Sequence, residues 1–489
     1  MRDKFLFTYG FLLRGLNQAV MNRLLGWFVV IAFTAQVLSS CTPFAPDARS
    51  GLEEIPMPES FSLKDSLKDP EQRWWETVGD EQLNSFVDEA LTDNQTLLSY
   101  WARLEKAQAQ ARKSGADLKP SLAGAAGASY TRIKTDNDSS VENENYSIGL
   151  VAGYEVDLWG RIRATNESAL LSAEASREDL NTVAMTVAAE VTERWVSILS
   201  KRLQRQLLEQ QLSNNKTYLE LVELRFRKSL ASALDVFQQR QLVERSKAQL
   251  PLIEMQERML QNQLAVLLGR MPNQSPEITR QELPVLDAVP DAGLPVQLLQ
   301  NRPDIVAAFR RLEAVDQDLA AARADRLPAL RLTGSAGYDS DNLEKVFDNW
   351  IANLAASLTA PVFDGGRRKA EIEINEAAVE QQLAEYRNLV LSAVREVEDA
   401  LISETKIREH VVASENQLQA AKNALKEAGT RYLNGLNDYL PVLTQLLSVQ
   451  GLENDLIRRR EDLLFARISL YRAIGGSWAD ELTPPAGKN

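Results

Sequence analysis

The sequence contains the same unit twice, and this duplication constrains the fold more than any other feature of the chain. From Gly160 to Gly269 the residues match a second segment 206 positions later without a gap, so that Gly160 corresponds to Gly366. Upstream of this stretch the offset is 208 positions, and Pro120 corresponds to Pro328. Self-similarity at a fixed offset is the signature of tandem structural repeats. The fold must therefore be one that a single unit builds twice.

Each repeat is predicted to contain a helix, a strand, a loop, a second strand, a long helix, a turn and a last helix. The repeats span about residues 91–270 and 298–476, and with N- and C-terminal equatorial segments they make one protomer over residues 41–489. Glycine is absent between Gly160 and Gly269, and proline occurs there once. A helix from Arg161 to about Lys228 would be about 100 Å long at 1.5 Å per residue.

Helices of this length are stable when they lie against one another. In two of the predicted helices, apolar residues recur every seven positions, as they do in coiled coils. These residues are Leu383, Val390 and Val397 in one helix, and Val449, Leu456, Leu463 and Leu470 in another. A plain soluble coiled coil is the alternative interpretation of the helices before the segments between them are considered.

The segments between the helices alternate between apolar and small or polar residues with a period of two, which is typical of β-strands. The clearest are Tyr146–Leu158 and Trp350–Val362, whereas Leu330–Tyr338 is shorter and Pro120–Tyr130 is mostly Ala and Gly. Their lengths approach the roughly 9–11 residues that a tilted membrane strand needs. A soluble antiparallel sheet is the alternative.

Aromatic residues flank the two predicted polar loops, as in the aromatic girdles of membrane barrels. They are Tyr130 and Tyr146 around loop 131–145, and Tyr338 and Trp350 around loop 339–349. Four strands cannot close a barrel, and open sheet edges are not tolerated in lipid. Three copies would supply twelve strands. The predicted fold is therefore mainly α with a membrane β-barrel: four strands and long helices per protomer, and a trimer that forms a 12-stranded β-barrel and a periplasmic α-helical barrel.

The N-terminus indicates an exported lipoprotein. Residues Leu24–Val37 are uncharged and mostly apolar, a length that suits the hydrophobic region of a signal peptide better than a membrane span. They lead into Leu38-Ser39-Ser40-Cys41, which resembles the lipobox of bacterial lipoproteins, where a peptidase cuts before a lipid-bearing Cys. We expect residues 1–40 to be the signal peptide, with Met1 or Met21 as its start, and Cys41 to be the lipid attachment site.

The inventory of reactive residues opposes an enzyme. Cys41 is the only Cys and His410 the only His, too few for a usual structural zinc site. The chain lacks P-loop, GxSxG and HExxH motifs. A net charge of −13 without a basic stripe also opposes nucleic-acid binding. We expect no catalytic residues, no cofactor and no metal.

Several short motifs occur in a fixed order along the mature chain. They are Cys41-Thr42-Pro43; Trp74-Trp75 with Asp80 and Leu83; Tyr154 to Arg161 (YEVDLWGR); Asn301-Arg302-Pro303-Asp304; Pro361 to Arg367 (PVFDGGR); and Arg431-Tyr432 with Gly435 and Leu440. In this combination the chain resembles the TolC-type outer-membrane factors, specifically the lipoprotein branch that serves resistance-nodulation-division efflux pumps. The resemblance covers essentially all of residues 41–489.

Two of these motifs also have a structural interpretation from the residues alone. The pair Gly365-Gly366 suits a sharp turn from a strand into a helix, because glycine tolerates positive φ angles. Pro303 suits the first turn of a helix, and Asp304 suits its positive end.

The resemblance implies a channel gate at the helical turns far from the barrel. The tyrosine of the family's lock corresponds to Tyr432 and its acidic partner to Asp235. The family's arginine is replaced here by Asn437, and an Asp often found in the narrowest ring is replaced by Thr444. We therefore expect a looser lock, with much of the closure provided by Leu440 as an apolar constriction.

The resemblance further implies that the chain is the passive exit duct of a tripartite efflux system for small molecules. Its partners would be two further copies, a periplasmic adaptor, an inner-membrane pump of the resistance-nodulation-division type and outer-membrane lipid. The chain would be lipid-anchored in the outer membrane, with its helices in the periplasm. A channel for type I protein secretion, and a structural coiled-coil lipoprotein without a pore, are the alternatives.

Substitution of Cys41 tests the predicted lipid attachment. A single acyl chain of myristoyl length binds membranes only marginally, whereas several chains anchor stably. Cys41→Ser should abolish both labelling with radioactive fatty acid and removal of residues 1–40, while insertion of the barrel can persist through its own apolar surface. Fatty-acid labelling that survives in the variant would disprove the assignment.

Overall fold

The computed structural model describes residues 43–46, 49, 57–61, 73–134, 140–286 and 295–484. The predicted signal peptide and Cys41 lie outside these residues. The chain divides into two compact units. The first contains residues 1–48, 108–172 and 311–382, and the second contains residues 49–107, 173–310 and 383–489.

The elements of the two repeats follow one another in the same order. The helices are α2 (Glu81–Asp93), α3 (Gln95–Ala116), α4 (Arg161–Arg227), α5 (Ala233–Leu267), α6 (Leu298–Asn301), α7 (Pro303–Ala324), α8 (Arg367–Leu433) and α9 (Leu440–Ile474). The strands are β1 (Ser121–Lys134), β2 (Ser140–Val156), β3 (Ala329–Ser340) and β4 (Trp350–Thr359). Short 3-10 helices include η1 (Trp74–Val78) and η5 (Trp478–Glu481).

The two long helices have the same length and end in the same way. Both α4 and α8 contain 67 residues, which confirms the prediction of a helix from Arg161 to about Lys228. Each is followed by a residue with a positive φ angle, Ser229 at 59° and Gly435 at 71°, and these two occupy equivalent positions in the repeats. A left-handed conformation costs a residue with a side chain roughly 1–2 kcal/mol, so the turn at Ser229 is held by its surroundings.

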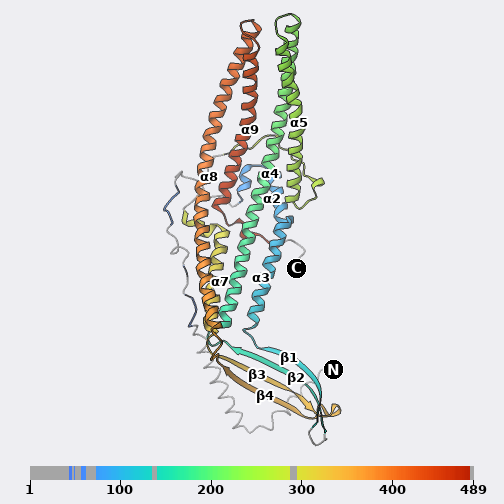
Figure 1. Ribbon diagram of the computed structural model, residues 1–489, viewed down its shortest axis with the longest axis vertical. Helices are drawn as coiled ribbons and strands as arrows, with labels where there is room; N and C mark the ends of the chain where they lie inside the picture. The colour runs from blue at the N-terminus through green and yellow to red at the C-terminus, as the bar shows by residue number, and fades with distance from the viewer. Residues whose placement is uncertain are drawn as a thin grey trace, which may run out of the picture. The chain divides into compact units, whose positions relative to one another are not determined.

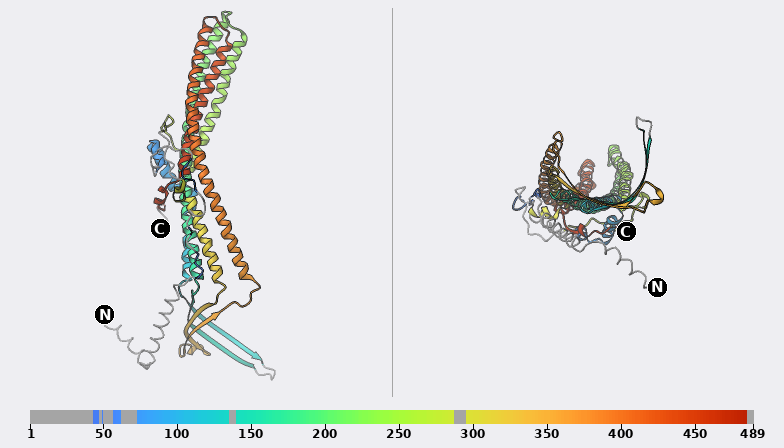
Figure 2. Two further views of the ribbon diagram at one scale, coloured as in Figure 1. Left: turned by 90° about the vertical axis from the view of Figure 1, so that its left-hand side faces the viewer. Right: turned by 90° about the horizontal axis from the view of Figure 1, so that it is seen from below.

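After each long helix the chain reverses direction, and the next helix packs against the long one. In this way α4 and α5 form one helical hairpin, and α8 and α9 form another (Figures 1 and 2). Of the residues with the predicted seven-residue spacing, Val390 and Val397 are buried on α8, and Val449 and Leu456 are buried on α9. The α8–α9 hairpin has an apolar cluster of its own, in which Val449 and Leu456 meet residues of α8. The predicted packing of long helices against one another is therefore seen in the contact between α8 and α9.

The largest core of the second unit is rich in aromatic residues. Trp75 is fully buried and meets Trp478 edge to face, with ring centroids 4.7 Å apart. Trp74 stacks on Tyr471 of α9 at 5.2 Å. Trp195 of α4 is fully buried in the same core. These contacts fix the chain segments that precede α2 and follow α9 against the long helices.

The four strands form one antiparallel sheet in the order β1-β2-β3-β4. All residues of β1 and of β4 are exposed on both faces of the sheet. A soluble sheet normally buries at least one face against a core. On β4 the even-numbered face carries Trp350, Leu354 and Leu358, and these apolar side chains are covered by nothing in the described chain. Such a face fits a lipid environment, as the alternation predicted.

The boundaries of all four strands differ from the prediction, by one or two residues in β3 and by more in β1, β2 and β4. β1 and β2 extend through most of the predicted loop 131–145, so Tyr130 and Tyr146 lie inside the strands and not at their ends. The antiparallel pairing continues from Tyr130 to Lys134 because residues 140–144 of β2 provide the backbone hydrogen-bonding partners. The polar side chains of this segment do not prevent backbone pairing. β4 ends at Thr359, before the predicted Val362, because Pro361 has no N–H group to continue a ladder.

The pairing register repeats with the offsets found in the sequence. Ser121 of β1 pairs with Gly153 of β2, and Ala329 of β3 pairs with Thr359 of β4. The shift from β1 to β3 is 208 positions, and the shift from β2 to β4 is 206 positions. Over the 10 residue pairs of the β3–β4 ladder, the two strand hairpins therefore have the same register.

No helix in the described part of the chain combines the length and the apolar character needed to cross a bilayer.

Neighbouring substitutions on β2 test which face of the sheet meets lipid. Leu150 lies on the even-numbered face and Val151 on the opposite one, and both are exposed. Leu150→Arg should destabilise the inserted protein by roughly 2–4 kcal/mol if the residue lies near the membrane midplane. Val151→Arg is the matched control and should cost less, as measured by urea unfolding from lipid vesicles. A larger loss for Val151→Arg would invert the assignment of the two faces.

Candidate functional site: the helical tips and the strand–helix junction

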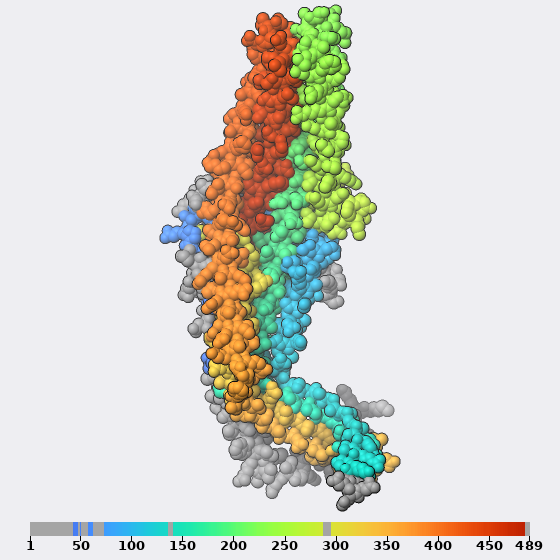
Figure 3. Space-filling model, in the orientation of Figure 1, coloured from blue at the N-terminus to red at the C-terminus, as the bar shows by residue number. Residues whose placement is uncertain are grey.

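The turns of the two helical hairpins lie beside each other and enclose an open groove of about 1150 Å³ between them. In Figure 3 the green tip belongs to α4 and α5, and the orange and red tip to α8 and α9. Four of the five predicted gate residues line this groove: Asp235, Tyr432, Asn437 and Leu440. Thr444 lies one helical turn further along α9 from Leu440, and its hydroxyl donates to the Leu440 carbonyl at 2.9 Å.

Asp235 lies in the first turn of helix α5 and forms a capping box with Ser232, the N-cap residue. The backbone N–H of Ser232 donates to the Asp235 carboxylate at 2.9 Å, and the backbone N–H of Asp235 donates to the Ser232 hydroxyl at 3.2 Å. A capping box satisfies backbone donors that the first turn of a helix leaves unpaired. Asp235 therefore has a structural role within its own turn, besides any role in a gate.

Tyr432 lies nearby but does not bond to Asp235 within one chain. Its ring is 3% exposed, and the Arg225 guanidinium lies 4.4 Å from the ring centroid. Its hydroxyl has no hydrogen-bond partner within the described residues. Burial raises the pKa of this hydroxyl and Arg225 opposes the shift, so it stays a neutral donor near neutral pH. The predicted Asp235–Tyr432 hydrogen bond is absent within the chain and remains a prediction for adjacent copies.

A second tyrosine, which the sequence reasoning missed, makes a buried hydrogen bond between the two hairpins. Tyr439 is fully buried, and its hydroxyl donates to the side-chain oxygen of Gln239 at 2.7 Å. Gln239 in turn donates to the backbone carbonyl of Asn215 at 2.8 Å. The Asn215 side chain donates to the Ser246 hydroxyl at 3.1 Å and accepts from Gln450 at 2.7 Å. We call these five residues the buried polar cluster.

The buried polar cluster joins α4 and α5 of the first hairpin to α9 and its N-cap in the second hairpin. Asn215 and Gln239 are fully buried, and a buried polar group that loses its partner is costly. Burial also raises the pKa of the Tyr439 hydroxyl, so it remains a donor. The sequence carried a signal for this cluster, since two of its polar residues differ from their counterparts in the other repeat. Asn215 corresponds to Ala421, and Tyr439 corresponds to Ala233.

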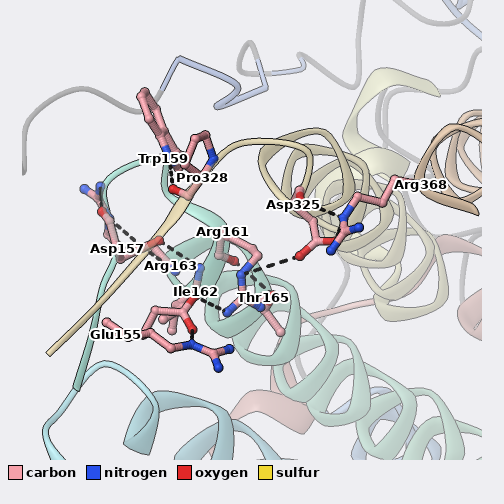
Figure 4. Close-up of polar contacts among 11 residues, drawn as sticks. Glu155, Asp157, Trp159, Arg161, Ile162, Arg163, Thr165, Asp325, Pro328 and Arg368 are labelled. Atoms are coloured by element: carbon pink, nitrogen blue, oxygen red, sulfur yellow. Dashed lines mark hydrogen bonds and ion pairs between the residues drawn. The ribbon is translucent and has the colours of Figure 1, made fainter. Parts of the chain in front are cut away.

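At the other end of α4, charged residues fix the passage from strand to helix (Figure 4). Glu155 of β2 accepts from Arg161 of α4 at 2.6 Å and from Arg331 of β3 at 3.2 Å. Asp157 accepts from the backbone N–H groups of Ile162 and Arg163 at 3.1 and 2.9 Å. This carboxylate therefore sits at the positive end of α4, where a negative charge is stabilising.

The second repeat makes the passage from β4 to α8 with Gly365 and Gly366, whose φ angles are 68° and 89°. This confirms the predicted turn, because such angles favour glycine. Asp364 accepts from the backbone N–H of Gly366 at 3.0 Å and from Arg368. Desolvation acts to raise the pKa of Asp364, but these bonds hold it below its usual value. Arg368 also donates to Asp325 at the end of α7, at 2.8 Å.

The predicted helix start at Pro303 is confirmed, since α7 begins there. Arg302, just before it, donates to Asp304 at 2.7 Å, to Glu396 of α8 at 2.8 Å and to the carbonyl of Ala473 on α9 at 3.2 Å. The Asn301 to Asp304 motif therefore joins α7 to the second hairpin, which is a structural role.

The first residues that the structure describes lie beside the strand–helix junction. Phe44 and Ala45 line a small cavity of about 250 Å³ together with Trp159 and Gly160. The Trp159 indole N–H donates to the carbonyl of Pro328 at 2.8 Å, which ties the end of β2 to the start of β3. Cys41 itself lies outside the described residues. Within the described chain, no group of three or more His, Cys, Asp or Glu residues is arranged to hold a metal ion.

The comparisons with known proteins agree with this geometry. The family model described as "Outer membrane efflux protein" matches residues 86–270 and 294–476. The pyoverdine export outer membrane protein OpmQ of Pseudomonas aeruginosa is 34% identical over 419 residues, covering 84% of this chain and 88% of that protein. The cation efflux system protein CusC of Escherichia coli is 28% identical and covers 91% of this chain and 97% of its own length.

A solved structure shows the same fold. The crystal structure of the open state of the MtrE outer membrane channel of Neisseria gonorrhoeae superimposes with a TM-score of 0.79 at 26% identity, covering 90% of this chain and 99% of that chain. Together with the family-model matches, which cover more than half of the chain, these similarities establish the family. The chain belongs to the outer membrane efflux proteins, and it is an outer-membrane channel protein of efflux systems.

Proposed function

We propose that this chain forms, as a homotrimer, the passive exit duct of a tripartite efflux machine. The observation that carries the proposal is the sheet. Its strands alternate between apolar residues on one face and mainly small or polar residues on the other, and every residue of β1 and β4 is exposed. Backbone groups at an open sheet edge are not tolerated in lipid, so the edges of β1 and β4 need partners. Three copies supply a closed barrel of ordinary size.

The energy for transport comes from elsewhere in the proposed machine. An inner-membrane pump of the resistance-nodulation-division type drives export, and a periplasmic adaptor joins it to the tips of the helical hairpins. Exposed apolar residues at the tips, among them Leu234 and Leu436, provide a surface that such an adaptor could cover. Relatives named for pyoverdine export and for cation efflux support small solutes as the class of cargo.

The lipid anchor at Cys41 belongs to the same proposal. Phe44, three positions after Cys41, lies beside Trp159 at the end of β2. A lipid on Cys41 would then be close to the strands that enter the membrane, as a lipid-anchored channel requires.

The assembly is tested with purified protein from outer membranes. The chain should migrate as a trimer by light scattering in detergent, and it should form discrete conducting channels in planar bilayers. A stable monomer that inserts no channels would contradict the proposed duct and favour a coiled-coil lipoprotein without a pore.

The tips are proposed to hold the resting gate, with Leu440 as an apolar constriction. Leu440 is 58% exposed in a single chain and begins α9 at the groove. Leu440→Ser should raise the resting conductance of single channels, because a hydroxyl lets water wet a narrow apolar passage. Leu440→Met retains the apolar volume and should leave conductance at the parental level. Equal conductance in all three proteins would place the constriction elsewhere.

Two tyrosine substitutions separate the bond within the chain from the proposed bond between copies. Tyr439→Phe removes a buried hydrogen bond, which should cost about 1–3 kcal/mol and speed amide hydrogen exchange at the start of α9. Tyr432→Phe removes a hydroxyl that has no partner in the described chain, so exchange should stay unchanged while resting conductance rises if Asp235 of an adjacent copy is its acceptor. Unchanged conductance in Tyr432→Phe would remove Tyr432 from the gate.

A further inference from the structure

The two strand–helix junctions are equivalent in the repeats but differ in charge. The first, residues 155–163, contains two carboxylates and two guanidinium groups, so its net charge is zero. The second, residues 361–369, contains one carboxylate, two guanidinium groups and one ammonium group, so its net charge is +2. Both junctions lie in the first compact unit. The excess positive charge of the second junction therefore needs an explanation.

The second junction lacks the two acids that hold the first together. In the first junction Glu155 accepts from Arg161 at 2.6 Å, and Asp157 accepts from backbone N–H groups at the start of α4. At the equivalent positions, 206 residues later, Pro361 replaces Glu155 and Phe363 replaces Asp157. The acids that would neutralise the cations of this junction are thus absent from it.

The cations of the second junction are nevertheless retained. Lys369 pairs with Glu373 of the next helical turn at 3.6 Å. Arg367, the counterpart of Arg161, is exposed, and its guanidinium has no hydrogen-bond or ion-pair partner within the described residues. A guanidinium group is always charged and presents donors that match phosphate and carboxylate oxygens. Arg367 is therefore available to an anion from outside the chain.

A second unpaired guanidinium lies at the same junction. Arg326, in the turn between α7 and β3, is exposed and also has no such partner in the part of the chain that the structure describes. Arg368 donates to Asp325 at 2.8 Å, which ties the start of α8 to the end of α7 (Figure 4). Arg326 directly follows Asp325, and Arg367 directly precedes Arg368. The bond therefore brings both unpaired cations to one junction.

Two large apolar residues lie beside these cations in the sequence. Val362 is 96% exposed and Phe363 is 92% exposed, so the described chain leaves both uncovered. They follow β4, which ends at Thr359. Exposed apolar residues next to unpaired basic residues are typical of protein surfaces that lie between lipid headgroups and acyl chains.

The length of β4 places these residues at the edge of the hydrocarbon, if β4 crosses the membrane as the proposed function requires. β4 contains 10 residues. At about 3.4 Å per residue it is about 34 Å long, and a tilt of about 45° reduces its height to about 24 Å. This height matches the apolar band of about 25 Å in outer-membrane barrels. The residues after Thr359 then lie at the level of the lipid phosphate groups on the side of the helices.

We infer that the second junction binds an anionic phospholipid from the leaflet that faces the helices. Arg367 and Arg326 contact the lipid phosphate, and Phe363 lies against the first part of the acyl chains. Arginine binds phosphate through strong charge-assisted hydrogen bonds. The inference rests on the proposed function and adds a lipid site to it.

An adjacent copy of the chain fits this surface less well. The turn before β1 would be the nearest part of that copy, and it contains one carboxylate and one ammonium group, those of Asp117 and Lys119. It therefore brings no net negative charge to Arg367 and Arg326. A phospholipid, by contrast, brings a phosphate and an apolar tail in one molecule, and so matches both the cations and Phe363.

Native mass spectrometry of the purified full-length protein in detergent tests the site. The probes are dioctanoyl phosphatidylglycerol, which is anionic, and dioctanoyl phosphatidylcholine, which has the same tails and no net charge. The parent should prefer the anionic lipid. A basic residue near an anionic lipid contributes about a five-fold preference, so Arg367→Gln should lower the preference about five-fold. Arg367→Gln with Arg326→Gln should lower it about 25-fold.

Three controls separate charge, tail contact and headgroup. Arg258→Gln removes the same charge from an exposed position of α5, in the other compact unit, and should leave the preference at the parental level. Phe363→Ser should weaken binding of both lipids about tenfold, because a phenyl group loses its apolar contact, whereas Phe363→Leu should retain most of the affinity. Glycerol phosphate, a headgroup without tails, should not displace the lipid at equal concentration.

The outcomes separate this inference from the proposed function. A parent without preference for phosphatidylglycerol, or a preference that survives in the double variant, would overturn the lipid site. Displacement by glycerol phosphate would indicate a site for soluble phosphate esters and would overturn it too. Loss of the trimer in the double variant would assign both cations to a contact between copies, with the same consequence. Trimer formation and conductance of the parent, measured without added phosphatidylglycerol, decide the proposed function separately.

Discussion

The demand that every backbone N–H and C=O be hydrogen-bonded governs this molecule. In water an open sheet edge costs little, but in a bilayer each unpaired group costs several kcal/mol, and only helices and closed barrels avoid the cost. This chain provides four strands, with the outer edges of β1 and β4 unpaired in the described residues. The strands therefore do not form a complete membrane structure by themselves. The helices, by contrast, satisfy their backbones internally and can extend 67 residues each.

Much of the fold could be predicted from the sequence, because duplication and periodicity are patterns that can be read directly along the chain. The predicted bounds of α4 agree with the observed ones to within a residue, and the alternation gave the two faces of β2 and β4. Strand ends were less accessible. β1 continues past Tyr130 because β2 supplies bonding partners across the hairpin, and the identity of a partner strand is not encoded in the polarity of one segment.

The candidate site was predicted only in part. The groove at the tips does collect Asp235, Tyr432, Asn437 and Leu440. Yet the hydroxyl with a partner belongs to Tyr439, because α9 begins one position later than the repeat offset implies and Tyr439 becomes its buried N-cap residue. A shift of one residue turns a side chain by about 100° around a helix axis. No motif carries that information, whereas the contrast of Asn215 with Ala421 between the repeats does point to the buried polar cluster.

That contrast has a consequence for how a ring of such chains could move. In a ring of three copies, six similar helical hairpins would lie side by side. The contacts between neighbouring hairpins, here called seams, would be of two alternating kinds, within a copy and between copies. Three seams, within copies, contain the bond from Tyr439 to Gln239 and the bond from Gln450 to Asn215. At the equivalent places in the other three seams stand Ala233 and Ala421, which have no polar side-chain atoms to offer. A ring built from these chains would therefore open at the contacts between copies, because those contacts lack these bonds. Each chain, with its two hairpins, would move as one body.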